Sequence, residues 1–192
     1  MRKEVKVVDR PSLTVHVDYD HLTVGELGNI LIRLQAALRS MAGLSPGEYD
    51  GRYYREQPRF VTSTVHTKQS IDINLLLAIL AVVMSAPGAY YQWSRFATDV
   101  FRWFKITILA IGRGEIKAIE DDINFEGLRI EVTKGKIDLE ASRPFLDELT
   151  PKQRRAVANF LWSLTGPARR VDIGDDESEI SIEWPERGKG GE

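Results

Sequence analysis

The first regular pattern in the chain is an alternation of apolar and polar residues between residues 13 and 20. Apolar side chains stand at every second position with polar ones between them: Leu13, Val15, Val17 and Tyr19 alternate with Thr14, His16, Asp18 and Asp20. A period of two indicates a β-strand with one buried face. The polar positions are therefore expected on the exposed face of a sheet.

A helix is predicted directly after this strand, because apolar residues there recur every three or four positions. Thr23 and Glu26 have the spacing of a capping box, in which the two side chains satisfy free backbone N–H groups of the first turn. Leu22 and Leu27 occupy the two positions of a hydrophobic staple. The apolar stripe and the terminal glycine of this helix are Leu27, Ile30, Leu31, Leu34, Leu38, Met41 and Gly43.

Later segments carry further signals of regular structure. Residues 60–67 are rich in β-branched residues and predict a second strand. Two alternating runs around Lys134 and Gly135 predict a hairpin, and residues 169–184 predict another. Between these hairpins, Thr150 as N-cap and Pro151 at the first position predict the start of a helix.

The stretch from Ile73 to Ser94 contains no charged residue, although 28% of the chain is charged. Its most apolar part, residues 75–84, predicts a helix that is covered on every side, with Ser70 or Asp72 as its cap. A second apolar helix is predicted over residues 93–111. The charged residues expected on its solvent side are Arg95, Asp99, Arg102 and Lys105.

These elements together predict an α+β fold. The N-terminal strands and the C-terminal hairpins form antiparallel sheet, in one piece or two, and pack on about four helices. The central apolar helical pair lies within residues 70–112. We expect one domain over residues 1–185 and a disordered tail over residues 186–192.

The uncharged stretch admits two interpretations. Its length suits a membrane-spanning helix, and Tyr90, Tyr91 and Trp93 followed by Arg95 have the order of an interfacial belt. The continuous apolar run from residue 75 to residue 84 is short, however, and runs of that length are more often buried core helices. The sequence favours a core element, and a membrane-inserting or pore-forming pair of helices over residues 73–111 is the alternative.

Composition narrows the classes of function. The formal net charge is −2, whereas proteins that bind nucleic acid usually carry a basic surplus. The chain has no cysteine, which excludes disulfide scaffolds, thiolate metal sites and cysteine catalysis. No cofactor motif is present, and the N-terminal residues lack the apolar core of a signal peptide. We therefore expect a cytoplasmic protein without a cofactor, with association at the inner membrane as the alternative.

Histidines and carboxylates offer the clearest candidate chemistry. His16, Asp18 and Asp20 project from one face of the first strand and could hold a divalent metal ion in a hydrolase. The alternative is that they are simply the exposed side of a half-buried strand, and the sequence favours this because no second ligand cluster completes a metal shell. His66 on the second strand lacks a recognisable partner for general-base catalysis. An enzyme ranks last among the functions considered.

Aromatic and basic residues form the candidate interaction surface. Tyrosine and arginine are enriched in protein–protein hot spots, and helix aromatics that a small core does not cover would add to such an interface. The loop before residue 60, the end of the uncharged stretch and the second apolar helix supply the candidates: Tyr53, Tyr54, Arg55, Tyr90, Tyr91, Trp93, Phe101, Trp103 and Phe104. A protein partner or a second copy of the chain is therefore the expected ligand.

The order of elements from Leu13 to Gly112 is similar to that of one group of bacterial proteins. A strand, the helix TVGELGNILIRLQAALRSM, a second strand, QSIDINLLLAIL and the helix ending FRWFKITILAIG follow one another. This layout resembles small accessory and adaptor-like domains of bacterial conflict and antiphage loci, including those likened to the TRADD N-terminal domain. The resemblance implies an adaptor or membrane-associated helper that works beside a separate effector and has no active site of its own.

Overall fold

The computed structural model describes residues 11–43, 59–66, 69–78, 89–117, 125 and 128–184. The elements follow in this order: β1 (Ser12–Tyr19), α1 (Val24–Met41), β2 (Arg59–His66), β3 (Ser70–Ala78), α2 (Ala89–Gly112), β4 (Arg129–Lys134), α3 (Arg143–Glu148), α4 (Pro151–Leu164), β5 (Ala168–Gly174) and β6 (Glu179–Glu183). Helices and antiparallel strands are thus combined, and the α+β fold class is confirmed. The loop residues before Arg59 and the tail after Trp184 lie outside the described residues.

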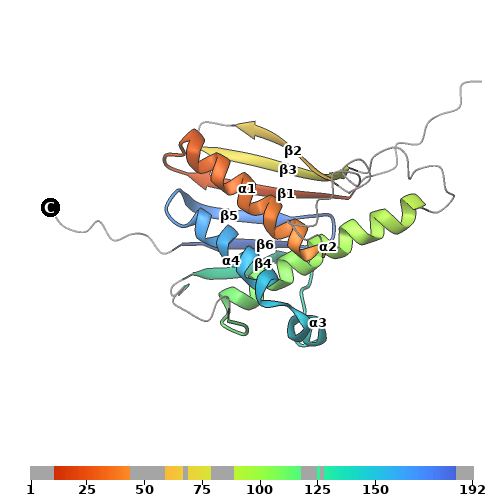
Figure 1. Cartoon of the computed structure of the whole chain (residues 1–192). Helices are drawn as coiled ribbons and strands as arrows, with labels where there is room; N and C mark the ends of the chain where they lie inside the picture. Colours follow the sequence, from red (N-terminus) through yellow and green to blue (C-terminus); the bar gives the residue numbers. More distant parts are fainter. Residues whose placement is uncertain are drawn as a thin grey trace, which may run out of the picture.

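The six strands of the described residues form one sheet in the order β2-β3-β1-β5-β6-β4 (Figure 1). Every neighbouring pair of strands is antiparallel. The centre of the sheet joins β1 to β5, which lie about 150 residues apart in the sequence, as the pairing of Val17 with Val171 shows. The sequence left open whether one sheet or two would form, and this pairing makes it one.

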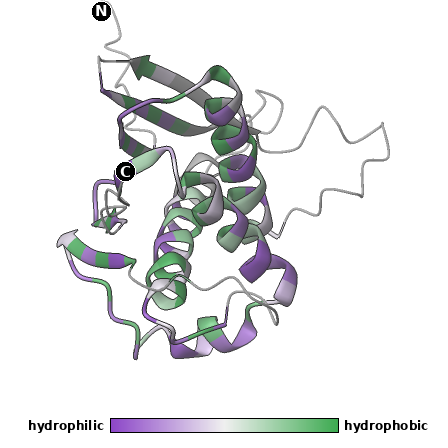
Figure 2. Ribbon diagram, turned by 90° about the vertical axis from the view of Figure 1, so that its left-hand side faces the viewer, coloured by the Kyte–Doolittle hydropathy of each residue, from purple (hydrophilic) through white to green (hydrophobic). Residues whose placement is uncertain are grey.

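The helices and the sheet form two layers, which Figure 2 shows in side view. The side chains that β1, β3, β5 and β6 turn toward the helices are apolar and fully buried: Leu13, Val15, Val17, Ile71, Ile73, Leu75, Val171, Ile173, Ile180 and Ile182. Polar residues alternate with them on the opposite face. The alternation predicted for β1 is therefore confirmed.

Helices α1 and α4 lie side by side and antiparallel over the sheet, and α2 runs along their edge (Figure 1). The side-chain amide of Gln153, at the start of α4, donates to the backbone oxygen of Ser40, at the end of α1, over 3.2 Å. The rings of Phe104 in α2 and Phe160 in α4 have centroids 5.5 Å apart. Apolar stripes with helical spacing thus meet in one core beneath the sheet.

Both predicted helix starts are confirmed. Thr23 and Glu26 form a reciprocal capping box at α1, and Thr150 and Gln153 form one at α4. Gly43 follows α1 with a φ of 70°, a left-handed conformation that glycine adopts without steric cost.

The predicted helix over residues 75–84 is wrong for the residues that the structure describes. Residues up to Ala78 belong to strand β3, and residues 79–84 lie outside the described part. Ile71, Ile73 and Leu75 alternate with Asp72 and Asn74, and β3 pairs with β1 on one side and with β2 on the other. Pairing on both sides satisfies the backbone, so the period of two prevails over the apolar run.

Among the described residues of this region, a strand therefore replaces the start of the first predicted helix, and α2 confirms the second. The alternative of two membrane helices over residues 73–111 requires a helix from residue 73 onward. Residues 73–78 belong to strand β3 instead. In the part of the chain that the structure describes, no helix combines the length and the apolar character needed to cross a membrane.

The predicted hairpin around Lys134 and Gly135 is also wrong. Strand β4 pairs with β6, and the chain leaves the sheet at Gly135, whose φ is 72°. Asp138 then turns the chain, because its side chain accepts from the backbone N–H of Ala141 and its backbone oxygen accepts from the hydroxyl of Ser142. These bonds lead into α3, a short helix that the sequence analysis missed.

Candidate functional site

The face of the sheet opposite the helices, called the open face below, is polar across five strands. The strand registers place Asp72, His16, Asp172, Ser181 and Glu131 in one row, from β3 through β1, β5 and β6 to β4. An adjacent row contains Ser70, Asp18, Arg170, Glu183 and Arg129. No helix of the described residues covers this face (Figure 2).

His16 lies between two carboxylates on this face. Its Nδ1 is 2.5 Å from Oδ1 of Asp72 on β3, and its Nε2 is 3.1 Å from Oδ1 of Asp18 on its own strand. Ionised carboxylates only accept hydrogen bonds, so both ring nitrogens must donate. The geometry therefore fits the imidazolium form, with one positive charge shared between two negative ones.

The surroundings of His16 act on its pKa in opposite directions. Partial burial lowers the pKa, but the hydrogen bond to Asp72 and the charges of Asp18 and Asp72 more than offset it and raise the pKa above its ordinary value of 6.5. With both nitrogens donating, the ring has no lone pair for a metal ion or for accepting a proton. In its imidazolium form, His16 is thus engaged by two carboxylates of its own fold.

The third residue of the candidate metal set lies elsewhere. Asp20 forms an ion pair with Arg169 at the start of β5. Within the described ranges, no group of three histidine or acidic residues is arranged to hold a metal ion. The structure thus brings His16 and Asp18 together and adds Asp72, which the sequence analysis had assigned as a helix cap.

Arg170 pairs with two carboxylates of the open face. Nε of Arg170 donates to both carboxylate oxygens of Asp172, over 3.0 and 3.1 Å, and its Nη1 lies 3.9 Å from Glu183. Ser181 lies in the row beside Asp172 and is only 6% exposed. Its hydroxyl oxygen is buried and makes no hydrogen bond within the described residues.

A second candidate site lies on α2, where the structure overturns a prediction. Lys105 was expected on the solvent side of this helix, but it is fully buried. Its Nζ donates to Oδ1 of Asp175 at 2.6 Å, and to the backbone oxygen and the hydroxyl of Ser178 at 2.8 and 2.7 Å. The ammonium group therefore fixes the turn between β5 and β6 against α2.

A serine beside a buried lysine is also the arrangement of Ser–Lys hydrolases. Ser178 borders a cavity of about 250 Å³. Burial lowers the pKa of Lys105, and the bond to Asp175 offsets part of that effect. All three N–H donors of Lys105 nevertheless meet acceptors, one of them a carboxylate. The lysine has no free lone pair to take a proton from Ser178, so the arrangement is a structural contact.

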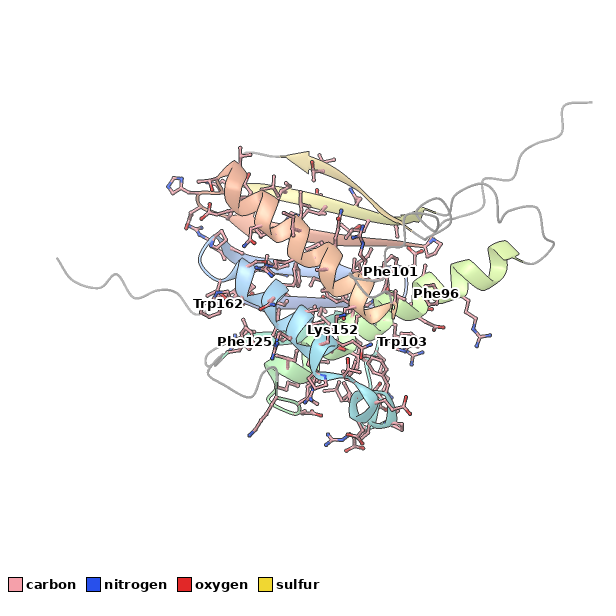
Figure 3. The ribbon with its side chains drawn as sticks, in the orientation of Figure 1. Phe96, Phe101, Trp103, Phe125, Lys152 and Trp162 are labelled. Atoms are coloured by element: carbon pink, nitrogen blue, oxygen red, sulfur yellow. The ribbon has the colours of Figure 1, made fainter. Side chains whose placement is uncertain are left out.

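The aromatic residues predicted at an interface lie in different environments; Figure 3 labels Phe101 and Trp103 among them. Phe101 and Phe104 are buried in the core and are not available to a partner. Trp103 is half-buried and stacks on Phe145 of α3, with ring centroids 5.4 Å apart. Tyr90, Tyr91 and Trp93 lie in the first turns of α2, whereas Tyr53, Tyr54 and Arg55 lie outside the described residues.

His66 ends strand β2, where its backbone pairs with Ile71 of β3. The interaction between His16 and Asp72 could not be read from the sequence, because the two residues are 56 positions apart. The only sequence signal for it was the alternation around Asp72 and Asn74, which places both side chains on one face of a strand.

A scan against protein-family models and searches of curated proteins and of solved structures find no significant match to this chain.

Proposed function

We propose that the protein is a non-enzymatic interaction module that works inside the cell and binds a protein partner through the open face. The observation that carries this proposal is the charge pattern of that face, which no described helix covers. Its carboxylates outnumber its cations by one among the described residues: Asp18, Asp72, Asp172, Glu131, Glu179 and Glu183 stand against Arg59, Arg129, Lys134, Arg170 and protonated His16.

The use of the candidate catalytic groups supports the same proposal. A general base needs a free lone pair that reaches a substrate. In its imidazolium form His16 donates from both nitrogens, and Lys105 donates all three of its hydrogens to groups of its own chain. These groups stabilise the fold. The open face is the large polar surface of the sheet and is therefore the proposed binding surface.

The resemblance in layout to adaptor-like domains implies the same class of function. The structure changes one element of that layout, since QSIDINLLLA forms strand β3. The proposal therefore depends on the open face and does not need the resemblance. The absence of cysteine in the sequence agrees with an intracellular location.

Charge reversal on the two faces of the molecule tests the proposal. The open-face variant carries Asp18→Lys and Glu183→Lys, whose side chains are 43% and 47% exposed in the native chain. The matched control carries Glu140→Lys and Glu148→Lys, two exposed residues on and beside the α3 segment. Tagged versions of each are expressed in the native cells, and thermal unfolding confirms that both variants fold.

Affinity capture followed by mass spectrometry provides the readout. The partners of the native chain should be lost from the open-face variant and kept by the control variant. The proposal is wrong if the open-face variant retains the same partners as the native chain. A self-associating chain would show its own mass doubled in size-exclusion chromatography with light scattering, and that association should also disappear in the open-face variant.

A further inference from the structure

We propose that the partner of the open face is a lysine- or arginine-rich protein segment, and that loss of the proton on His16 strengthens its binding. This inference rests on the proposed function and specifies the chemistry and the control of the same surface. It follows from three features of the described residues: the excess of carboxylates, the position of His16 among them, and an unpartnered hydroxyl in the same row.

The excess of carboxylates determines the charge of the partner. Asp18 and Asp72 have side chains that are 43% and 37% exposed, and among the described side chains His16 is the cation that bonds to both of them. Asp172 already accepts a bifurcated hydrogen bond from Nε of Arg170. A cationic segment complements such a surface, because opposite charges steer association and select against wrong partners.

His16 competes with a cationic partner for the same carboxylates. In the imidazolium form, the ring uses Oδ1 of Asp18 and Oδ1 of Asp72. A neutral imidazole has one N–H and therefore releases one of these two carboxylates. Deprotonation thus removes one positive charge from the open face and frees one acceptor for a lysine or arginine side chain.

The neighbours of His16 belong to three strands. Asp18 and Thr14 flank it on β1, Asp72 and Asn74 face it from β3, and Asp172 and Arg170 face it from β5. The single cation among these neighbours, Arg170, is engaged by Asp172 and Glu183. Arg170 also lies opposite Asp18 and interacts with its charge. Protonated His16 is the described cation that is hydrogen-bonded to both Asp18 and Asp72.

The hydroxyl of Ser181 is an independent sign that this face receives a donor. Ser181 alternates with the buried Ile180 and Ile182, so its side chain points to the open face. It is 94% buried, because its exposed fraction is 6%, and its oxygen lacks a hydrogen-bond partner within the described residues. Buried hydroxyl groups without a partner are uncommon in native structures. A guanidinium or ammonium group of a partner would supply the missing donor once it displaces the side chains that enclose this oxygen.

A labelled lysine-rich peptide serves as the probe. Its binding to the full chain is measured by fluorescence anisotropy between pH 5.5 and 8.5 at constant ionic strength. We expect roughly fivefold tighter binding at the upper end, because one unit charge at contact distance in water changes an equilibrium constant by about that factor. His16→Gln should bind tightly with little dependence on pH. His21→Gln, which removes an exposed histidine next to β1, should keep the pH dependence of the native chain.

Two further variants show where the peptide binds. Asp18→Asn should weaken binding at pH 8.5, while Glu148→Gln on α3 removes the same charge elsewhere and should leave binding unchanged. Equal weakening by both variants, or no binding at all, would overturn the inference of a basic partner. A pH dependence that survives in His16→Gln would overturn the inference of control by His16. Neither result decides the capture experiment above, which makes no assumption about the charge of the partner.

Discussion

Replacing Lys105 by methionine should cost the protein a large part of its stability. The side chain of Lys105 is 1% exposed and that of Asp175 is 8% exposed, and their charged groups are 2.6 Å apart. Methionine fills a similar volume, so the main effect is to leave the carboxylate of Asp175 buried without its cation. One of its oxygens, Oδ2, already has no hydrogen-bond partner among the described residues.

The magnitude follows from the energetics of buried ion pairs. Removing one partner of such a pair typically costs about 3–5 kcal/mol, because the other charge stays buried and unpaired. Total stabilities of proteins are about 5–15 kcal/mol, so the loss is a substantial fraction. For a chain of this length, each kcal/mol lowers the melting temperature by roughly 2–4 °C. The oxygen atom Oδ1 keeps the backbone donors of Glu177 and Ser178, which limits the loss.

A double-mutant cycle in urea, followed by circular dichroism, measures the effect. Asp175→Asn alone should also be strongly destabilising, because Lys105 then stays buried without a counter-ion. The double variant Lys105→Met with Asp175→Asn should cost only about 1–2 kcal/mol, since replacing both charges of a buried pair removes the need to solvate either. The double variant should therefore cost much less than the sum of the two single variants, which means that the two sites are strongly coupled.

Two results would refute this reasoning. If the single variants add within about 0.5 kcal/mol, the two groups are not coupled, as is usual for distant sites. If Lys105→Met alone costs less than about 1 kcal/mol, the side chain is not held in a buried contact with the turn between β5 and β6. Either outcome would mean that Lys105 lies on the solvent side of α2, as the sequence pattern predicted.

The same unfolding assay checks four more expectations. Because the pKa of His16 is raised in the folded state, its ion pairs stabilise the protein below pH 6.5. About 0.5–1 kcal/mol of stability should be lost as the pH rises through the folded-state pKa. His16→Gln should abolish this dependence on pH. Gly28→Ala should stabilise α1 by about 1 kcal/mol, since nothing lies within 4 Å of the added carbon atom. Gly135→Ala should cost at least about 2 kcal/mol, because its φ is 72° and the new carbon atom would lie 2.2 Å from the backbone oxygen of Glu177. Thr150→Ala should cost about 1 kcal/mol through loss of the N-cap of α4; an unchanged midpoint would contradict that role.

Several parts of the structure follow from local sequence alone. The capping box of Thr23 and Glu26 involves residues three positions apart, and a period of two placed His16 and Asp18 on the polar face of β1. The hairpin of β5 and β6 likewise needs only a short turn. Such features are predictable because the interacting groups are neighbours in the chain, so backbone geometry alone brings them together.

Other parts depend on contacts between distant segments. The alternation around Asp72 was present in the sequence, but only pairing with β1 and β2 makes that segment a strand, and this pairing brings Asp72 to His16. Lys105 follows the spacing of exposed residues on α2, yet the turn at Asp175 covers it from about seventy positions away. Periodicity specifies which face of an element is polar. Which element lies against that face is decided by the packing of the whole chain, because burial and ion pairing act between segments whose separation in sequence places no constraint on their distance in space.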